Sequence, residues 1–342
     1  MTGEDVRLIV GTYARLGGRG LVQLTVRENE LVVGPSLAAV ADASFGVRSR
    51  AGRTFLAVEQ QQGQVVELHG GPDGWRCGSS VSTGGAAPCH LALDPAERQL
   101  AVANYESGSI ALFRIDGTAP LRAEPRAHCQ FSGHGPNEER QAGPHAHWVG
   151  FSRDSRWLYA VDLGSDQILL FAVDSDASRL GSAEIAYQAT AGSGPRHLVF
   201  HPTLPLAFLV SELASTLTVL RVTGDGRLDE LDTLPTLPAG AGESLGGAIA
   251  INAAGDRLYV TNRGHDSIAT FGIAASGAIP VQHVPSGGAS PRFLLLLERQ
   301  RRLLVANEEG GTVCQFGVDD DGRLSAIGAP AEIPGAVFLA AV

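Results

Sequence analysis

HLALDPAERQLAVANYESGSIALFRI, residues 90–115, sets the pattern for the whole chain. It contains an apolar run, a polar turn, a second apolar run that ends in polar residues, another turn and a third apolar run. Short apolar runs separated by Asp, Pro, Gly and Ser are typical of antiparallel β-strands joined by tight turns. The stretch therefore predicts three consecutive strands.

The same sequence pattern recurs along the chain with a spacing of about 45 to 55 residues, as expected for the blades of a β-propeller. A weaker fourth run follows, for example EIAYQAT at 184–190. Each repeat therefore predicts a four-stranded antiparallel blade. The six complete copies begin at Phe45, His90, His147, His197, Ala248 and Phe293.

The two ends of the chain carry the pieces of one more repeat. RLIVGTYARLGGRGLVQLTV, residues 7–26, matches the second and third strands of the phrase, and AVFLAAV, residues 336–342, matches a first strand. Pairing of the terminal strands would complete a seventh blade and leave no open sheet edge. We predict an all-β fold, a seven-bladed propeller that forms a single domain over residues 1–342.

Composition narrows the classes of function. The formal net charge is −10 and no Lys/Arg block occurs, so nucleic acid is disfavoured as a partner. The beginning of the sequence lacks a basic leader with an apolar segment, and no run reaches the roughly 18 apolar residues of a membrane span. We expect a cytoplasmic protein without membrane contact, and a monomer, because a closed propeller has no edge strand that needs a mate.

The four cysteines are scattered without a C-x-x-C pair, so the sequence indicates neither a zinc site nor a disulfide framework. We expect buried or inert thiols. They are Cys77, Cys89, Cys129 and Cys314.

Polar residues gather at one end of the predicted blades. In an antiparallel blade, the residues before the first strand and after the second lie at the same end. The turns at the other end of the blades, such as DPAER and NAAGD, are ordinary hairpin connectors. We expect a functional site at the mouth of the channel, formed by Cys89, His90, Asn104, Tyr105, His145, His147, Asp162, Arg196, His197, Glu212, Arg263, Arg292, Asn307 and Glu308.

Three arginines in this set, Arg196, Arg263 and Arg292, come from different blades. The planar guanidinium fork suits phosphate or carboxylate, so the three side chains could converge on one anion. The alternative is that they pair with neighbouring carboxylates such as Glu212 or Asp162.

Glu212 could act as a general base for water, with His147 as a second proton-transfer group. The alternative for Glu212 is a salt bridge to Arg196. His145 and His147 are two residues apart in an extended stretch and could share a metal ion, but two histidines do not fill a metal site. We expect no metal and no cofactor.

A long polar loop at 128–147 precedes the third full repeat. Long loops in compact domains are often functional, and Asn137, Arg140 and Gln141 could fold over the channel mouth. The alternative is a solvated connector.

The chain resembles the lactonase family of seven-bladed β-propellers, which includes one class of 6-phosphogluconolactonases and fungal carboxy-muconate cyclising enzymes. The resemblance covers essentially the whole chain. The motifs that carry it are GHGPNEERQAGPHAH at 133–147, GSGPRHLVFHP at 192–202, SEL at 211–213, YVTNRGHDSIATF at 259–271 and LLVANEEGGTV at 303–313.

The resemblance implies metal-independent catalysis by a histidine, a glutamate and arginines, which correspond here to His147, Glu212, Arg196 and Arg263. It also implies substrate binding by Arg292. Two positions depart from the family pattern: Ala248 replaces a common acid, and FLAVEQ at 55–60 replaces a common Asn-Glu pair. These departures concern the substrate more than the fold.

We therefore expect a lactone hydrolase that opens 6-phosphogluconolactone to 6-phosphogluconate. A muconate-lactonising enzyme and a non-catalytic binding scaffold are the alternatives. The expected ligand is a small anionic sugar lactone or a related acid. Its expected binding residues are Arg292, His145, His197, Arg140, Asn137, Gln141, Tyr105 and Asp162.

Overall fold

The computed structural model describes residues 5–59, 63–71, 74–174, 180–275 and 277–342. Within these residues the strands form seven sheets of four strands each, in which successive strands run antiparallel. Two 3-10 turns, η1 (Ala14–Leu16) and η2 (Glu298–Gln300), are the helical elements of this part of the chain. The prediction of seven four-stranded blades is confirmed.

The chain divides into two compact units. The first unit comprises Met1–Ala41, His197–Val222 and Asp229–Val342, and the second comprises Asp42–Arg196 and Thr223–Leu228. Arg196 thus groups with the second unit, although most of its blade belongs to the first. The prediction of one domain over residues 1–342 stays a prediction.

Four blades lie wholly or mostly in the first unit. Their strands, in sheet order, are β28 (Ala336–Ala341), β1 (Val6–Thr12), β2 (Leu21–Val26) and β3 (Leu31–Leu37); β16 (Pro195–Phe200), β17 (Leu206–Ser211), β18 (Thr216–Val222) and β19 (Leu228–Pro235); β20 (Leu245–Ile251), β21 (Arg257–Arg263), β22 (Ser267–Ala274) and β23 (Gly277–Pro285); and β24 (Pro291–Leu297), β25 (Arg302–Asn307), β26 (Thr312–Val318) and β27 (Leu324–Glu332).

Three blades lie in the second unit. Their strands are β4 (Ala43–Arg48), β5 (Thr54–Val58), β6 (Gln64–Gly71) and β7 (Gly74–Ser82); β8 (Pro88–Leu93), β9 (Gln99–Asn104), β10 (Ser109–Arg114) and β11 (Ala127–Gln130); and β12 (Ala146–Phe151), β13 (Trp157–Asp162), β14 (Gln167–Ala172) and β15 (Glu184–Gln188).

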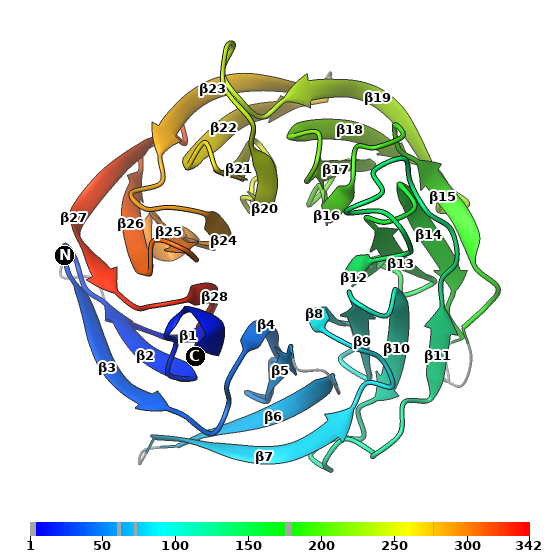
Figure 1. Cartoon of the computed structure of the whole chain (residues 1–342), viewed down its shortest axis with the longest axis horizontal. Helices are drawn as coiled ribbons and strands as arrows, with labels where there is room; N and C mark the ends of the chain where they lie inside the picture. The colour runs from blue at the N-terminus through cyan, green and yellow to red at the C-terminus, as the bar shows by residue number, and fades with distance from the viewer. Residues whose placement is uncertain (1–4, 60–62, 72–73, 175–179, 276) are drawn as a thin grey trace. The chain divides into compact units, whose positions relative to one another are not determined.

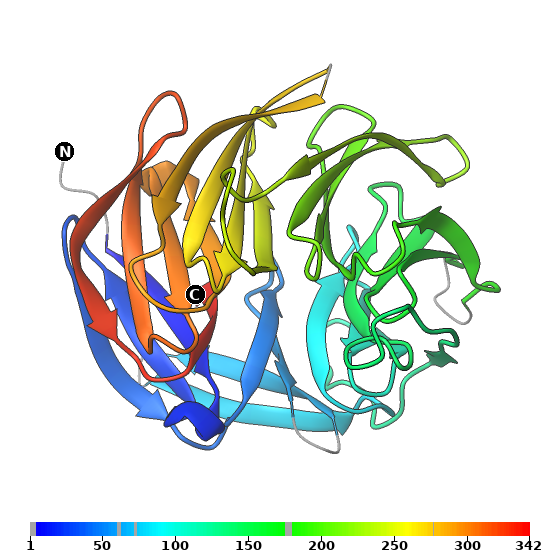
Figure 2. The same ribbon diagram turned by 45° about the horizontal axis from the view of Figure 1, so that its top comes forward.

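The last strand of the chain completes the first blade. β28 pairs antiparallel with β1, with Val10 opposite Leu339 and Leu8 opposite Ala341. Figure 1 and Figure 2 show the red β28 beside the blue β1. The predicted pairing of the terminal strands is confirmed, and it covers the edge that β1 would otherwise expose.

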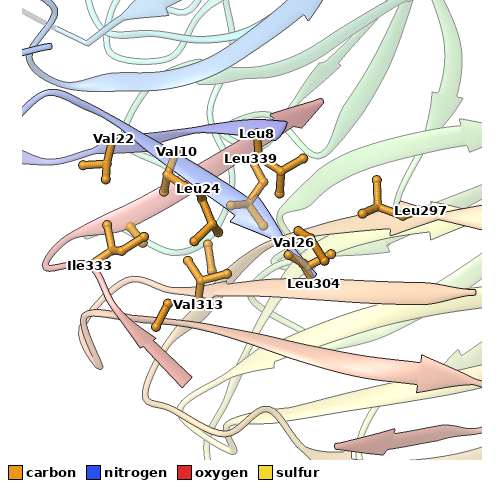
Figure 3. Close-up of a cluster of buried hydrophobic side chains, with 13 residues drawn as sticks. Leu8, Val10, Val22, Leu24, Val26, Leu297, Leu304, Val313, Ile333 and Leu339 are labelled. Atoms are coloured by element: carbon orange, nitrogen blue, oxygen red, sulfur yellow. The ribbon is translucent and has the colours of Figure 1, made fainter. Parts of the chain in front are cut away.

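Within each unit, apolar side chains fill the space between neighbouring blades. In the first unit, one cluster joins the β28–β3 blade to the β24–β27 blade, and Leu8, Leu304 and Leu339 within it are at most 1% exposed (Figure 3). Burial of a leucine of this kind stabilises the fold by roughly 1.5–3 kcal/mol. Comparable clusters join neighbouring blades in the second unit. The first strands of the blades contribute apolar side chains to these clusters, for example Leu91 in β8 and Val149 in β12.

A β-bulge interrupts the first strand of several blades close to its start. Pairing in β8 passes from Pro88 to His90, in β12 from Ala146 to Trp148, and in β24 from Pro291 to Phe293. The residues left over are Cys89, His147 and Arg292. Because a bulge leaves its extra residue outside the ladder, it changes the direction of that side chain relative to regular alternation.

The polar loop before β12 is shorter than the sequence suggests. Residues 127–130 form β11, the outer strand of the preceding blade, so the loop itself begins at Phe131. Among the described residues, no helix is long and apolar enough to cross a membrane.

Candidate active site

In the first unit, Glu212 and Arg263 form a buried ion pair. Glu212 follows β17 directly and Arg263 ends β21, so each lies at the end of the second strand of its blade. Arg263 Nη2 lies 2.7 Å from Glu212 Oε2, and the two side chains are 11% and 3% exposed. An ion pair withdrawn from water to this degree places both groups firmly, because solvent screens it little.

Glycines let the two blades approach closely enough for this pair. The Gly246 N–H donates to the Glu212 carbonyl at 2.8 Å, and Arg263 Nη2 donates to the Gly246 carbonyl at 3.1 Å. A Cβ at Gly246 would lie 2.5 Å from the Ser211 carbonyl oxygen. Only glycine fits that contact without moving the backbone, so Gly246 sets the position of the pair.

Arg263 keeps one donor unused. Its Nε is buried and has no hydrogen-bond partner among the described residues. A buried donor without a partner costs about 1–3 kcal/mol, so a ligand that accepted from it would recover that energy. The arrangement offers a carboxylate that can accept a proton beside a guanidinium that can stabilise negative charge.

A second cluster in the first unit contains two arginines, a carboxylate and a phenol. Arg292 Nη1 lies 3.3 Å from Glu308 Oε2, and Arg292 Nη2 donates to the Tyr13 hydroxyl at 3.0 Å. Arg15 forms an ion pair with the other oxygen of Glu308. Both guanidinium groups lie against the Tyr13 ring, with Cζ 4.9 Å (Arg15) and 5.3 Å (Arg292) from its centroid.

These two clusters lie at the same end of neighbouring blades. Gly247 follows the glycine that binds Arg263, and a Cβ on it would lie 2.8 Å from the carbonyl oxygen of Pro291. Arg292 is the next residue along the chain. The start of β20 therefore packs against the start of β24 and links the Glu212–Arg263 pair to the Arg292 cluster.

In the second unit, Tyr105 contacts three predicted site residues. Its ring stacks on His145 with centroids 4.5 Å apart and meets His147 edge-on at 5.4 Å. The carbonyl of Tyr105 lies 3.1 Å from His145 Nδ1, and its hydroxyl accepts from Arg140 Nη2 at 3.5 Å. This group combines donors and proton-transfer side chains, as an anion-binding or acid–base site requires.

Asp162 holds the backbone of His145 in this group. It is fully buried and accepts hydrogen bonds from the backbone N–H of His145 at 2.6 Å and of Gly164 at 3.0 Å, and from the Ser165 hydroxyl. Burial raises the pKa of Asp162, against these donors, which lower it. Its contacts are with the chain that carries His145, so it acts as an anchor for that residue.

His90 and Arg196 are both buried in this unit, and the charge of Arg196 acts on His90. Arg196 is 2% exposed and His90 is 7% exposed. Burial, and then the positive charge of Arg196, lower the pKa of His90 to about 3. His90 Nδ1 accepts from the Val149 N–H at 3.4 Å, so the neutral ring carries its proton on Nε2.

Cys89 packs against the bulge that holds His147. Its Sγ lies 3.5 Å from the carbonyl oxygens of Ala146 and of His147, and 3.9 Å from His147 Nδ1. All four cysteines are free, and Cys89 and Cys314 are buried. The thiol of Cys89 therefore donates to the backbone that shapes the bulge.

The polar loop is held by its own side chains. Asn137 accepts from the backbone N–H of Arg140, whereas Gln141 is fully buried and donates to the Leu163 carbonyl and to Asp166, each at 2.9 Å. Arg140 is the member of the predicted trio that reaches another site residue, Tyr105. His197 is 8% exposed in β16.

The structure thus brings together Glu212 with Arg263, and His145 with His147, Tyr105 and Arg140. Arg292 pairs with Glu308. Tyr13 and Arg15 are absent from the residues predicted from the sequence. They follow β1, the second strand of its blade, so the rule that located Glu212 and Arg263 would have found them.

Metal-ligating side chains do not cluster in the part of the chain described here: no three of His, Cys, Asp and Glu are placed to share an ion.

Comparison with known proteins connects the chain to a family. The family model described as "Lactonase, 7-bladed beta-propeller" matches residues 7–341. The 6-phosphogluconolactonase of Bacillus subtilis (strain 168) is 30% identical over 339 residues, which cover 95% of each chain.

Two solved structures show similar folds. A protein from Lactobacillus plantarum superposes with a TM-score of 0.92 at 28% identity, covering 99% of this chain and 100% of that one. The periplasmic gluconolactonase of Pseudomonas aeruginosa gives a TM-score of 0.91 at 28% identity and covers 99% of both chains. The chain is a seven-bladed β-propeller and belongs to the lactonase family of such propellers.

Proposed function

We propose that the protein hydrolyses a sugar lactone, with Glu212 as the general base and Arg263 as the group that stabilises the oxyanion. The observation that carries this proposal is the buried pair with its spare donor: Arg263 Nη2 lies 2.7 Å from Glu212 Oε2, while Arg263 Nε lacks a hydrogen-bond partner among the described residues. Membership of the lactonase family supports the class of reaction.

The chemistry follows from these two side chains. Glu212 takes a proton from water as the water oxygen attacks the lactone carbonyl carbon. Arg263 donates to the carbonyl oxygen while negative charge builds on it. The ring C–O bond then breaks, and the departing oxygen takes the proton back from Glu212. The product is a hydroxy acid, which loses its carboxyl proton to water, and the enzyme is restored.

We propose 6-phosphogluconolactone as the substrate. Two features support it: the Bacillus subtilis relative carries the name 6-phosphogluconolactonase, and the arginines at this end of the first unit suit a negatively charged ligand. Catalytic roles for His147 and Arg196, and binding roles for His145, His197, Arg140, Asn137, Gln141, Tyr105 and Asp162, stay predictions. So do the monomeric state and the cytoplasmic location.

A paired assay tests the proposal. Hydrolysis of 6-phosphogluconolactone, corrected for spontaneous opening, is measured for the wild type and for Glu212→Gln. Loss of a general base typically costs 10²- to 10⁴-fold, so we expect kcat to fall by at least about 100-fold. Glu28→Gln, which changes an exposed glutamate between β2 and β3, should keep the wild-type rate. A Glu212→Gln enzyme with undiminished kcat would refute the assignment of the base.

Independence from metal is part of the proposal and has its own test. Dialysis against a chelator should leave kcat unchanged, and added divalent ions should not raise it. Activity that vanishes on chelation and returns with one metal would overturn this part. A wild type that opens no lactone, with or without metal, would favour the muconate reaction or a binding role.

A further inference from the structure

In the first unit, the cluster of Tyr13, Arg15, Arg292 and Glu308 carries more positive than negative charge. Two guanidinium groups share one carboxylate, one on each oxygen. The carboxylate is nearly closed off, with its side chain 6% exposed, while Arg15 is 64% exposed. Two like charges held at one carboxylate repel each other, and a further anion would relieve that repulsion.

The geometry points to Arg15, supported by Tyr13 and Arg292, as the residue that selects lactones bearing an anionic group away from the reacting ring. In the proposed substrate this group is the phosphoryl group. The inference rests on the proposed function for the position of the lactone ring at Glu212 and Arg263. Arg15 would thus be a specificity-determining residue.

The surroundings hold Arg15 in place for this role. Its guanidinium is fixed at one end by Glu308 and lies 4.9 Å from the centroid of the Tyr13 ring, whose residue is 4% exposed. One of its nitrogens meets Glu308, and the side chain as a whole faces solvent. A guanidinium has five N–H donors, so most remain for a phosphoryl group.

A series of contacts connects Arg263 to the cluster. Gly247 lies against the Pro291 carbonyl, and its neighbour Gly246 binds Arg263. Arg292 follows Pro291 and reaches Glu308 and Tyr13. A ligand reaching from Glu212 in the β16–β19 blade to Arg15 in the β28–β3 blade would span the same end of four successive blades of the first unit.

The competing explanation is that Arg15 only fastens η1 to the β24–β27 blade. A fastening role would change stability and would affect all substrates alike. The test therefore compares 6-phosphogluconolactone with gluconolactone, which lacks the phosphoryl group, in the wild type, Arg15→Gln and Arg15→Lys. The matched control is Arg19→Gln, which removes the same charge from an exposed position in the same segment.

We expect Arg15→Gln to raise KM for 6-phosphogluconolactone about tenfold, as the loss of a charge-assisted hydrogen bond predicts, with kcat changed less than twofold. KM for gluconolactone should stay the same. Arg15→Lys should give an intermediate KM, since it keeps the charge and loses the fork. Arg19→Gln should match the wild type. An equal rise for both lactones, or no rise, would overturn the inference.

A binding measurement separates this inference from the proposed function. Calorimetric titration with 6-phosphogluconate and with gluconate does not depend on turnover. A wild-type preference for the phosphorylated acid that Arg15→Gln abolishes supports the role of Arg15 even if neither lactone is opened. Absence of that preference in the wild type overturns the role even if both lactones are opened.

Discussion

In the proposed reaction, Arg263 both pairs with Glu212 and donates to the carbonyl oxygen of the lactone. It pairs with Glu212 through Nη2 and also donates to the Gly246 carbonyl, while its Nε stays buried without a partner among the described residues. A lysine at this position would keep the charge, but it has a single nitrogen and no planar fork. The two tasks would then compete for one group.

We therefore predict that Arg263→Lys lowers kcat for the lactone by about 100-fold, the usual cost of one oxyanion donor, with a smaller change in KM. Steady-state kinetics with the phosphorylated lactone would measure both constants, and the circular dichroism spectrum would show whether the fold is kept. An Arg263→Lys enzyme with wild-type kcat would mean that charge alone is needed at this position.

His90 makes the stability of the protein depend on pH. Its pKa is lowered to about 3 in the folded state, because burial and then Arg196 oppose the charged form. The ordinary pKa of histidine is about 6.5, so below pH 6.5 the unfolded chain binds the proton and the folded chain does not. The free energy of unfolding thus falls as pH drops from about 6.5 toward 3, by up to about 1.4 kcal/mol per pH unit from this group.

Replacement of His90 by glutamine should flatten this dependence. Between pH 7 and pH 5 the wild type should lose about 2 kcal/mol more of its free energy of unfolding than His90→Gln does. Urea titrations at the two pH values measure the loss. His128→Gln, at an exposed position in β11, should lose as much as the wild type. Equal losses in all three proteins would show that His90 does not stay neutral when folded.

At the scale of the strand, the first strands of several blades are irregular close to their starts. Bulges at Cys89, His147 and Arg292 take these residues out of the regular ladder. In β20 the corresponding irregularity spans Gly247 and Ala248, and the Ala248 N–H donates to the Thr261 hydroxyl at 2.8 Å instead of to a ladder partner. The start of β20 therefore has its own conformation, which depends on small residues.

Gly247→Ala tests this dependence. The added Cβ would lie 2.3 Å from Thr261 Oγ1 and 2.8 Å from the Pro291 carbonyl, so the backbone must shift. We expect a loss of about 1–3 kcal/mol in the free energy of unfolding, the usual cost of overpacking, together with a lower kcat/KM. Chemical denaturation and lactone hydrolysis measure the two effects.

Gly242→Ala is the matched control, because a Cβ there meets nothing within 4 Å. It should leave the activity and the midpoint of unfolding close to those of the wild type. If Gly247→Ala behaved like this control, β20 would have room that the structure does not show.

The sequence predicts strands better than it predicts side-chain partners. The phrase at 90–115 places three strands that the structure confirms as β8, β9 and β10, because alternating apolar runs and turn residues are local signals. The rule for strand ends likewise locates Glu212 and Arg263. Their mutual pairing depends on how closely β20 approaches the end of β17, which is a tertiary contact at Gly246.

Two further residues show what the sequence alone does not predict. The bulge at His147 has no signature in the sequence, since the extra residue is recognised only against its partner strand. The place of Gln141 in the polar loop does not reveal that its side chain is fully buried and donates to Asp166. Asp166 also accepts from the N–H groups of Gly192 and Gly194. The Gln141 amide is therefore one of several donors to this carboxylate.

At the scale of the whole molecule, the pairing of β1 with β28 joins the two ends of the described chain. Val10 lies opposite Leu339, although more than 300 residues separate them in the chain. The entropic cost of closing a loop grows with its length, so this contact costs more to form than pairing within any other blade. Contacts of this kind tend to form after the transition state for folding.

Leu339→Ala should therefore act mainly on unfolding. Leu339 is 1% exposed in the cluster shown in Figure 3, and a buried Leu→Ala change costs about 3 kcal/mol. If this energy is absent from the transition state, the unfolding rate rises on the order of 100-fold while the refolding rate changes little. Leu217→Ala, in a cluster built from neighbouring blades, should slow refolding as well. Stopped-flow measurements over a range of urea concentrations give both rates. If the refolding rate fell as much for Leu339→Ala as for Leu217→Ala, the terminal strands would pair early, before the blades between them are complete.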